Sequence, residues 1–189
     1  MLERRVDAFD RRVDRWMAQW RGNRLADAAA YSASALGDHG LIWFLVGVAR
    51  GRRRGPRRSS AVRAVAFTGL VAPGVNAALK AAVGRVRPEP SFRHALPVRI
   101  PRTASFPSGH SLAAWCAATL LAEGDPWAPG YYLMAGAVSM SRIHVRLHHA
   151  TDVVAGSVLG LALGLVGRRV LPVHGKLMGR MECAAPDRS

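Results

Sequence analysis

The distribution of charge along this 189-residue chain constrains its fold more than any other feature. Long apolar stretches alternate with short stretches that are dense in arginine, whereas a soluble protein scatters its charges along amphipathic elements. A bilayer core about 30 Å thick needs about 20 helical residues to cross it. Five apolar segments approach or reach that length, at residues 28–49, 61–83, 108–122, 127–141 and 150–170. The pattern predicts an all-α fold, an integral-membrane helical bundle with about five transmembrane helices.

The first 27 residues predict a helix of another kind. Apolar residues recur every three or four positions and form one stripe, made of Leu2, Val6, Phe9, Val13, Trp16, Met17 and Trp20. Arginines occupy much of the remaining surface, which is typical of an amphipathic helix at a membrane interface. Packing on a soluble core is the alternative, and the apolar segments that follow favour the interface.

Three regions are therefore expected: residues 1–27 as an interfacial helix, 28–170 as a membrane-embedded domain and 171–189 as a basic polar tail. Asp38 and His39 interrupt the first apolar segment. Ionisable groups in mid-span are costly unless they face the bundle interior. We expect them to form a buried polar pair, with a role in substrate binding as the alternative.

The formal net charge of +15 raises the possibility of nucleic-acid binding. The basic residues flank apolar segments, however, and no nucleic-acid-binding motif accompanies them. The bilayer and its anionic lipid headgroups are the expected partners, and nucleic acid is not. The oligomeric state stays unknown at this stage.

Polar clusters at the ends of the apolar segments fall on one face of the predicted bundle. They are Lys80 with Arg87 and Pro88, then Pro107-Ser108-Gly109-His110, then Ser141-Arg142 with His148 and Asp152. Counting the crossings places the end of the second segment, the start of the third, the end of the fourth and the start of the fifth together. We therefore expect one site at this face.

Several of these side chains suit a phosphate. Lys80 and Arg87 are two helical turns apart if the helix continues to Pro88, and Arg142 adds a third cation. Guanidinium groups fit phosphate oxygens as bidentate donors. Ser108 and Gly109 at a helix start direct backbone N–H groups and the positive end of the helix dipole towards an anion.

Two histidines and a carboxylate supply reactive groups. His148 and Asp152 are four residues apart and would share one helical face, where the carboxylate fixes the imidazole tautomer and leaves the other nitrogen as a nucleophile. His110 can protonate a leaving oxygen. His149 is the alternative nucleophile, but only His148 has the spacing.

The pattern K-x6-R-P, P-S-G-H and S-R-x5-H-x3-D, from Lys80 to Asp152, resembles the type-2 phosphatidic acid phosphatase superfamily, which also contains the vanadium haloperoxidases. The resemblance implies that His148 is the nucleophile, Asp152 its orienting partner and His110 the general acid. It implies no metal or cofactor. The phosphate-binding residues would be Lys80, Arg87, Ser108, Gly109 and Arg142. Such proteins commonly have six spans, so five leaves the topology in doubt.

The resemblance implies a phosphatase that forms a phosphohistidine and acts on a lipid phosphate in a multi-pass protein of a bacterial plasma membrane. The candidate substrates are polyprenyl phosphates or diphosphates, a prenyl-linked phosphosugar, phosphatidic acid and phosphatidylglycerol phosphate. A vanadate-dependent haloperoxidase and a non-catalytic lipid-binding protein are the alternatives. Basic residues are about evenly divided between the two faces, so the positive-inside rule leaves the side of the site undetermined.

Overall fold

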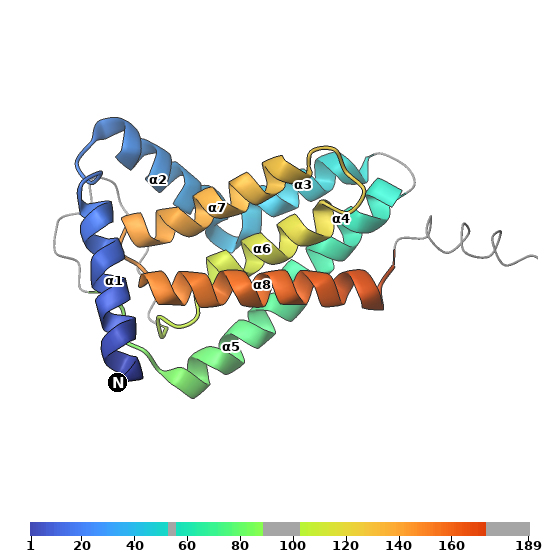
Figure 1. The fold of residues 1–189 in the computed structure, drawn as a ribbon. Helices are drawn as coiled ribbons and strands as arrows, with labels where there is room; N and C mark the ends of the chain where they lie inside the picture. The colour runs from blue at the N-terminus through green and yellow to red at the C-terminus, as the bar shows by residue number, and fades with distance from the viewer. Residues whose placement is uncertain (53–55, 89–102, 173–189) are drawn as a thin grey trace, which may run out of the picture.

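The computed structural model describes residues 1–52, 56–88 and 103–172. Within these ranges every regular element is a helix, which confirms the all-α class (Figure 1). The elements are α1 (Leu2–Ala18), α2 (Arg24–Gly37), a 3-10 turn (Asp38–Gly40), α3 (Leu41–Gly51), α4 (Pro56–Ala66), a π-helical turn (Phe67–Val71), α5 (Ala72–Val83), α6 (Gly109–Leu121), α7 (Ala128–His144) and α8 (Ala150–Val170).

Helix α6 is the centre of the bundle. It contacts α4, α7 and α8, and its side chains are almost all buried. Its approach to α8 is so close that a Cβ at Gly160 would lie 2.2 Å from the Leu112 carbonyl oxygen. A Cβ at Gly156 would lie 2.4 Å from the carbonyl oxygen of Ser108. Small residues at helix–helix contacts are typical of membrane bundles, and here they bring the start of α6 against the start of α8.

Two continuous helical stretches are long and apolar enough to cross a bilayer: residues Arg58–Val83, which join α4 to α5, and Ala150–Val170. Helices α2 and α3 together form a third if they count as one span. The two helices are bent by 68° relative to each other, so such a span would be broken. The span predicted over residues 28–49 is not one continuous helix, since the chain turns at Gly40 with φ of +69°. With 13 and 17 residues, α6 and α7 are short, and the count of five spans stays a prediction.

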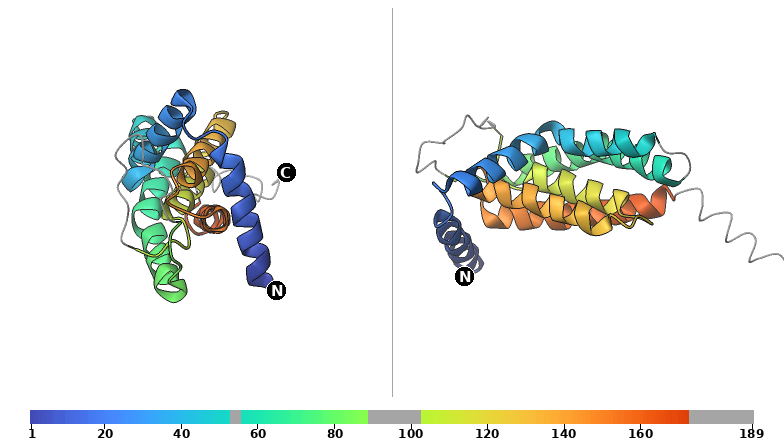
Figure 2. Two further views of the ribbon diagram at one scale, coloured as in Figure 1. Left: turned by 90° about the vertical axis from the view of Figure 1, so that its left-hand side faces the viewer. Right: turned by 90° about the horizontal axis from the view of Figure 1, so that it is seen from above.

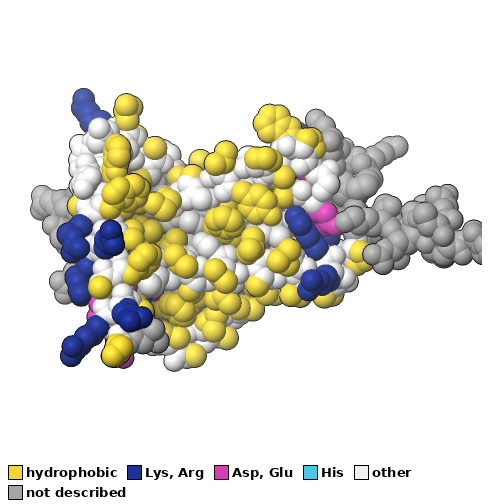
Figure 3. All heavy atoms as spheres, viewed as in Figure 1, with side chains coloured by type: hydrophobic (Ala, Val, Ile, Leu, Met, Phe, Trp, Pro, Cys, Tyr) yellow, Lys and Arg dark blue, Asp and Glu magenta, His cyan; other side chains and the backbone are white. Residues whose placement is uncertain are grey.

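The surface has the polarity expected of a protein in a bilayer. Figure 3 shows hydrophobic side chains along the middle of the molecule, with lysine and arginine side chains gathered towards its two ends. Large apolar side chains stay exposed on the outer helices, including Leu70 on the π-helical turn and Leu133 on α7. Exposed apolar surface of this extent is stable only in contact with another apolar phase.

Helix α1 lies across one end of the bundle, beside the ends of α7 and α8 (Figures 1 and 2). Val13 and Met17 pack on Ile143, Ala150 and Val153. Phe9, Trp16 and Trp20, from the same apolar stripe, remain about half exposed. The predicted amphipathic helix is thus present and docked on the bundle, and its position at the membrane interface remains a prediction. Most of the predicted tail, from residue 173 onwards, lies outside the described residues.

Candidate active site

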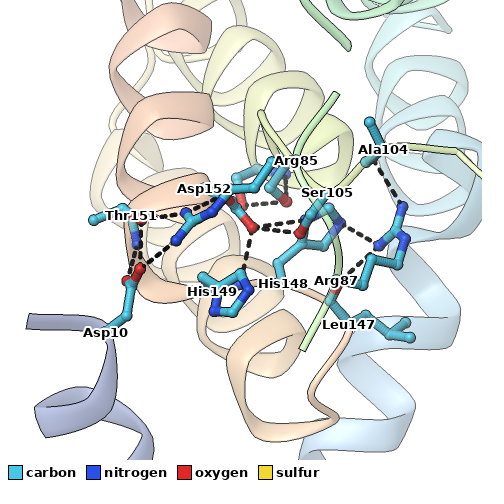
Figure 4. A network of polar contacts seen from close by, with 12 residues as sticks. Asp10, Arg85, Arg87, Ala104, Ser105, Leu147, His148, His149, Thr151 and Asp152 are labelled. Atoms are coloured by element: carbon cyan, nitrogen blue, oxygen red, sulfur yellow. Dashed lines mark hydrogen bonds and ion pairs between the residues drawn. The ribbon is translucent and has the colours of Figure 1, made fainter. Parts of the chain in front are cut away.

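The predicted site residues come from four element ends that meet beneath α1. The backbone N–H of Ser108, at the start of α6, donates to the backbone carbonyl of Asp152 in the first turn of α8 at 3.0 Å. The N–H of His148 donates to the carbonyl of Arg142, near the end of α7, at 3.2 Å. Segments far apart in the sequence are therefore fixed to one another by their own backbones, close to the side chains that would do chemistry (Figure 4).

His148 lies next to Asp152 but not in the way expected. Helix α8 begins at Ala150 with His149 as its N-cap, so His148 is in the turn before the helix and the two do not share a helical face. The turn still places Nδ1 of His148 3.7 Å from Oδ2 of Asp152. His148 is only 3% exposed. The pair is thus positioned by the α7–α8 turn and not by helical periodicity.

The other ring nitrogen of His148 faces a cation. Nη1 of Arg87 lies 3.3 Å from Nε2 of His148. A guanidinium group can only donate, so this contact uses the lone pair of Nε2 and places the imidazole proton on Nδ1, towards Asp152. Burial lowers the pKa of His148 to about 4, which the Asp152 carboxylate opposes and the nearby Arg87 and Arg142 cations reinforce. The imidazole is therefore neutral at pH 7.

The carboxylate of Asp152 is held by three donors. Arg85 donates through Nη1 to Oδ1 at 2.8 Å, and the backbone N–H of His149 donates to Oδ2 at 2.9 Å. The hydroxyl of Ser105 donates to the same Oδ2. Arg85 and Ser105 were missed by the sequence reasoning. The sequence offered one signal for each: Arg85 lies between Lys80 and Arg87, and Ser105 lies three residues before Ser108.

The two cations of the first cluster meet without the helix that was expected to align them. Helix α5 ends at Val83, because Gly84 takes a left-handed conformation with φ of +62°. Lys80 nevertheless donates through Nζ to the Ala104 carbonyl, and Nη2 of Arg87 donates to the same oxygen at 3.3 Å. A non-helical segment after α5, and not a longer helix, carries Arg87 to His148.

The start of α6 is a helix end capped by a serine, and its role in binding an anion stays a prediction. Ser108 is the N-cap, and its hydroxyl oxygen accepts from the Ser111 N–H at 3.5 Å. A Cβ at Gly109 would lie 2.8 Å from Nδ2 of Asn76, so the glycine allows the α5 side chain to approach. Asn76 is a further residue that sequence reasoning missed, although it is a polar residue within an apolar segment.

His110 is paired with Asp38. Nε2 of His110 lies 2.7 Å from Oδ1 of Asp38, and Nη1 of Arg142 lies 3.8 Å from that same oxygen. Asp38 pairs with a residue of another helix, as expected, but its side chain is 42% exposed, so the expectation that it is buried is wrong. Arg142 itself is 1% exposed and also donates to the Ser34 hydroxyl.

The remaining histidines near the motif have structural contacts. Nε2 of His144 lies 2.7 Å from Oδ1 of Asp27, which joins α7 to α2. The His149 side chain accepts from the backbone of Asp152 as the N-cap of α8. The predicted loop between the second and third apolar segments also contains basic residues, namely Arg93, His94, Arg99 and Arg102. These four lie outside the described residues.

Two cavities adjoin these groups. One, of about 380 Å³, lies between α1 and His148 and is lined mainly by charged side chains: Asp7, Asp10, Arg11, Asp14, Arg85, Arg87, Arg146, His148 and His149 among others. The second, of about 440 Å³, lies beside His110 and is mostly apolar, with Phe44, Val65, Ala72, Pro73 and Ala113 in its wall. A polar cavity and an apolar one thus adjoin different parts of the motif.

Comparison with known families decides the classification. Residues 61–176 match the family model of the PAP2 superfamily. The chain belongs to the PAP2 superfamily. A decaprenylphosphoryl-5-phosphoribose phosphatase of Mycolicibacterium smegmatis is 34% identical over 130 residues, which cover 67% of this chain and 69% of that protein. The phosphatase of the same name from Mycobacterium tuberculosis is 29% identical over 140 residues, covering 74% and 77%.

Solved structures share the fold of this PAP2 protein. A transmembrane PAP2-type phosphatidylglycerolphosphate phosphatase from Bacillus subtilis superposes with a TM-score of 0.68 at 23% identity, covering 97% of this chain and 89% of that one. LpxE of Aquifex aeolicus gives 0.68 at 20% identity, covering 84% and 93%. The family and its named relatives make the chain a phosphoric ester hydrolase of the lipid phosphatase family. Its apolar helices and this fold make it an integral-membrane protein.

Proposed function

We propose that this PAP2 phosphatase removes phosphate from a lipid-linked phosphate through a phosphohistidine on His148. The contact that carries the proposal is Nη1 of Arg87 at 3.3 Å from Nε2 of His148. It marks Nε2 as the unprotonated nitrogen, and its lone pair becomes the nucleophile once the Arg87 N–H turns to a phosphate oxygen. Nδ1, 3.7 Å from Asp152, then carries the proton, and the carboxylate stabilises the positive charge that the ring gains on attack.

Hydrolysis would proceed by two displacements at phosphorus. In the first, Nε2 of His148 forms the bond to phosphorus, the bond to the lipid oxygen breaks, and His110 protonates the departing alkoxide. In the second, His110 takes a proton from water, whose oxygen displaces His148 and releases inorganic phosphate. Lys80, Arg87 and Arg142 would balance the phosphate charge, with the backbone N–H of Gly109 and the hydroxyl of Ser108, whose own N–H is bound to the Asp152 carbonyl.

Asp38 supports the assignment of His110 as the acid. An ionised carboxylate can only accept, so Nε2 of His110 carries a proton in the 2.7 Å contact with Asp38. The ring is thereby oriented, and the proton for the leaving group would come from Nδ1. His148 with Asp152 and His110 with Asp38 then form two imidazole–carboxylate pairs with opposite tasks.

We further propose a prenyl-linked phosphosugar as the substrate. The support is the two mycobacterial relatives, which are named for a decaprenyl-linked phosphoribose. The charged cavity of about 380 Å³ beside His148 lies within the usual size range of small-molecule sites and would take the sugar phosphate. The apolar cavity beside His110 would take the first part of the prenyl chain.

The test is phosphate release by the detergent-purified protein in EDTA. The panel holds a decaprenyl-linked phosphoribose, a polyprenyl diphosphate, phosphatidic acid and phosphatidylglycerol phosphate. We expect release from the phosphosugar lipid, loss of release in His148→Ala, and most of the activity in the matched control His149→Ala. Activity lost in EDTA and restored by Mg²⁺ would contradict the mechanism, because the cations assigned to the phosphate are side chains of the protein. Preference for another lipid would contradict the substrate alone.

A further inference from the structure

Asp10 differs from the other charged residues of α1 because it is buried. The residue is 7% exposed, whereas the other charged residues of α1 are exposed or half-buried. Its Oδ1 accepts from the backbone N–H of Thr151 at 2.8 Å, and its Oδ2 accepts from the Thr151 hydroxyl at 2.9 Å. Oδ2 also accepts from Nη2 of Arg85 at 2.8 Å. Three donors from two distant parts of the chain therefore meet on this carboxylate.

Arg85 connects that carboxylate to the catalytic end of α8 (Figure 4). While Nη2 binds Asp10, Nη1 donates to Oδ1 of Asp152 at 2.8 Å and to the Thr151 hydroxyl at 2.7 Å. Burial lowers the pKa of Arg85, but the hydrogen bonds and charges of Asp10 and Asp152 outweigh it and raise that pKa overall. The planar guanidinium is fixed between two carboxylates, one on the N-terminal helix and one beside His148.

Asp10 also fixes the helix that carries Asp152. The Thr151 N–H belongs to the first turn of α8, where backbone donors have no acceptor within the helix. A carboxylate at this helix end is stabilised by the helix dipole as well as by the hydrogen bond. Asp10 thus restrains Asp152 in two ways, through its backbone at the start of α8 and through its side chain by way of Arg85.

We propose that Asp10 and Arg85 are positioning residues for Asp152. Because Asp10 belongs to α1, the enzyme then turns over substrate only when α1 is docked across the end of the bundle. The inference rests on the proposed function, which assigns Asp152 to the orientation of His148. With Asp10 neutral, Arg85 loses one of its two anchors, and Oδ1 of Asp152 is no longer held at the angle that directs Oδ2 to the imidazole. Although Asp10 lies in the wall of the charged cavity, both of its carboxylate oxygens accept from Thr151 or Arg85, so the effect falls on the chemical step more than on substrate binding.

The experiment compares Asp10→Asn with Glu3→Gln, which removes the same charge from an exposed position of α1. We expect Asp10→Asn to lower kcat about tenfold or more, the size of a lost charged hydrogen bond, with KM unchanged. Glu3→Gln should match the wild type. Asp10→Glu, which restores the charge, should recover part of kcat. Thr151→Val, which removes one shared hydroxyl, provides a milder variant with a smaller loss in the same direction.

A double-mutant cycle distinguishes positioning through Arg85 from simple anchoring of α1. If Asp10 acts through Arg85, then Asp10→Asn combined with Arg85→Gln should be hardly slower than Arg85→Gln alone. Losses in kcat that multiply would overturn the inference, and so would a lowered Tm with kcat intact. His148→Ala is measured beside them. Activity retained there would overturn the proposed function too, whereas a silent His148→Ala with a fully active Asp10→Asn overturns this inference alone.

Discussion

Asp38 and His110, 72 positions apart in the chain, lie 2.7 Å from each other through Oδ1 and Nε2. Asp38 belongs to the turn that breaks the first apolar segment, and His110 to the first turn of α6. A residue that interrupts a hydrophobic segment therefore has a partner in the catalytic motif. The break between α2 and α3 is what allows this contact.

Asp38→Asn tests that pair. We expect turnover of a lipid alkyl phosphate to fall by about 10²-fold, the lower end of what a general acid contributes, because the His110 ring loses its orienting carboxylate. A nitrophenyl phosphate, whose leaving group departs without a proton, should lose much less. Asp27→Asn, which breaks the His144 pair, is the control and should show no such dependence. Equal losses for the two leaving groups would contradict the role of Asp38.

The charge state of His148 can be followed by NMR. Burial lowers its pKa to about 4, below the ordinary value of about 6.5, so the ring stays neutral as the pH falls from 8 to about 5. Because the folded pKa is the lower one, the stability contributed by the neutral ring is complete above about pH 6.5 and is lost as the pH falls towards 4. The resonance absent from His148→Ala identifies the residue. A titration midpoint at 6.5 or higher would contradict the assignment.

The close contact of α6 and α8 predicts that a methyl group added to a glycine at this contact lowers Tm, whereas one added to a glycine with open space does not. Gly160→Ala should lower Tm by several degrees, since its Cβ would meet the Leu112 carbonyl at 2.2 Å and overpacking costs about 1–3 kcal/mol. Gly136→Ala on α7 is the control, because a Cβ there meets nothing within 4 Å. Thermal unfolding in detergent measures both. Equal Tm values would show that the two helices separate without cost.

The five-span topology makes a prediction about sides. Three of the predicted spans lie between the loop at residues 84–107 and the C-terminal tail, and this odd number places the site and the tail on opposite faces of the membrane. Reporters fused after residue 189 and inserted into the loop at residues 84–107 should therefore respond to opposite compartments. Reporters on the same side would require an even number of spans after residue 107 and would contradict the predicted count. The absolute assignment also tells which side of the membrane the substrate phosphate occupies.

Some properties of this protein follow from its sequence alone, and others depend on its tertiary structure. The sequence by itself determined the all-α membrane class, because the length of an apolar segment is set by bilayer thickness and is read locally. It also predicted which residues would carry the phosphate chemistry, because the spacing of Lys80, His110 and His148 around the segment ends depends only on order along the chain. The presence of a helix at the N-terminus followed from its three-and-four periodicity.

Only the tertiary structure decided how those residues meet. The left-handed Gly84 ends α5, so Arg87 reaches His148 along a non-helical segment and not along a helix. The sequence analysis did not single out Asp10. It lies four residues after Val6 and three before Val13, so an acid stands on the apolar stripe where an apolar residue was expected. Its contact with Arg85 spans 75 positions. Pairs this distant are set by the packing of whole helices, which no local pattern of residues encodes.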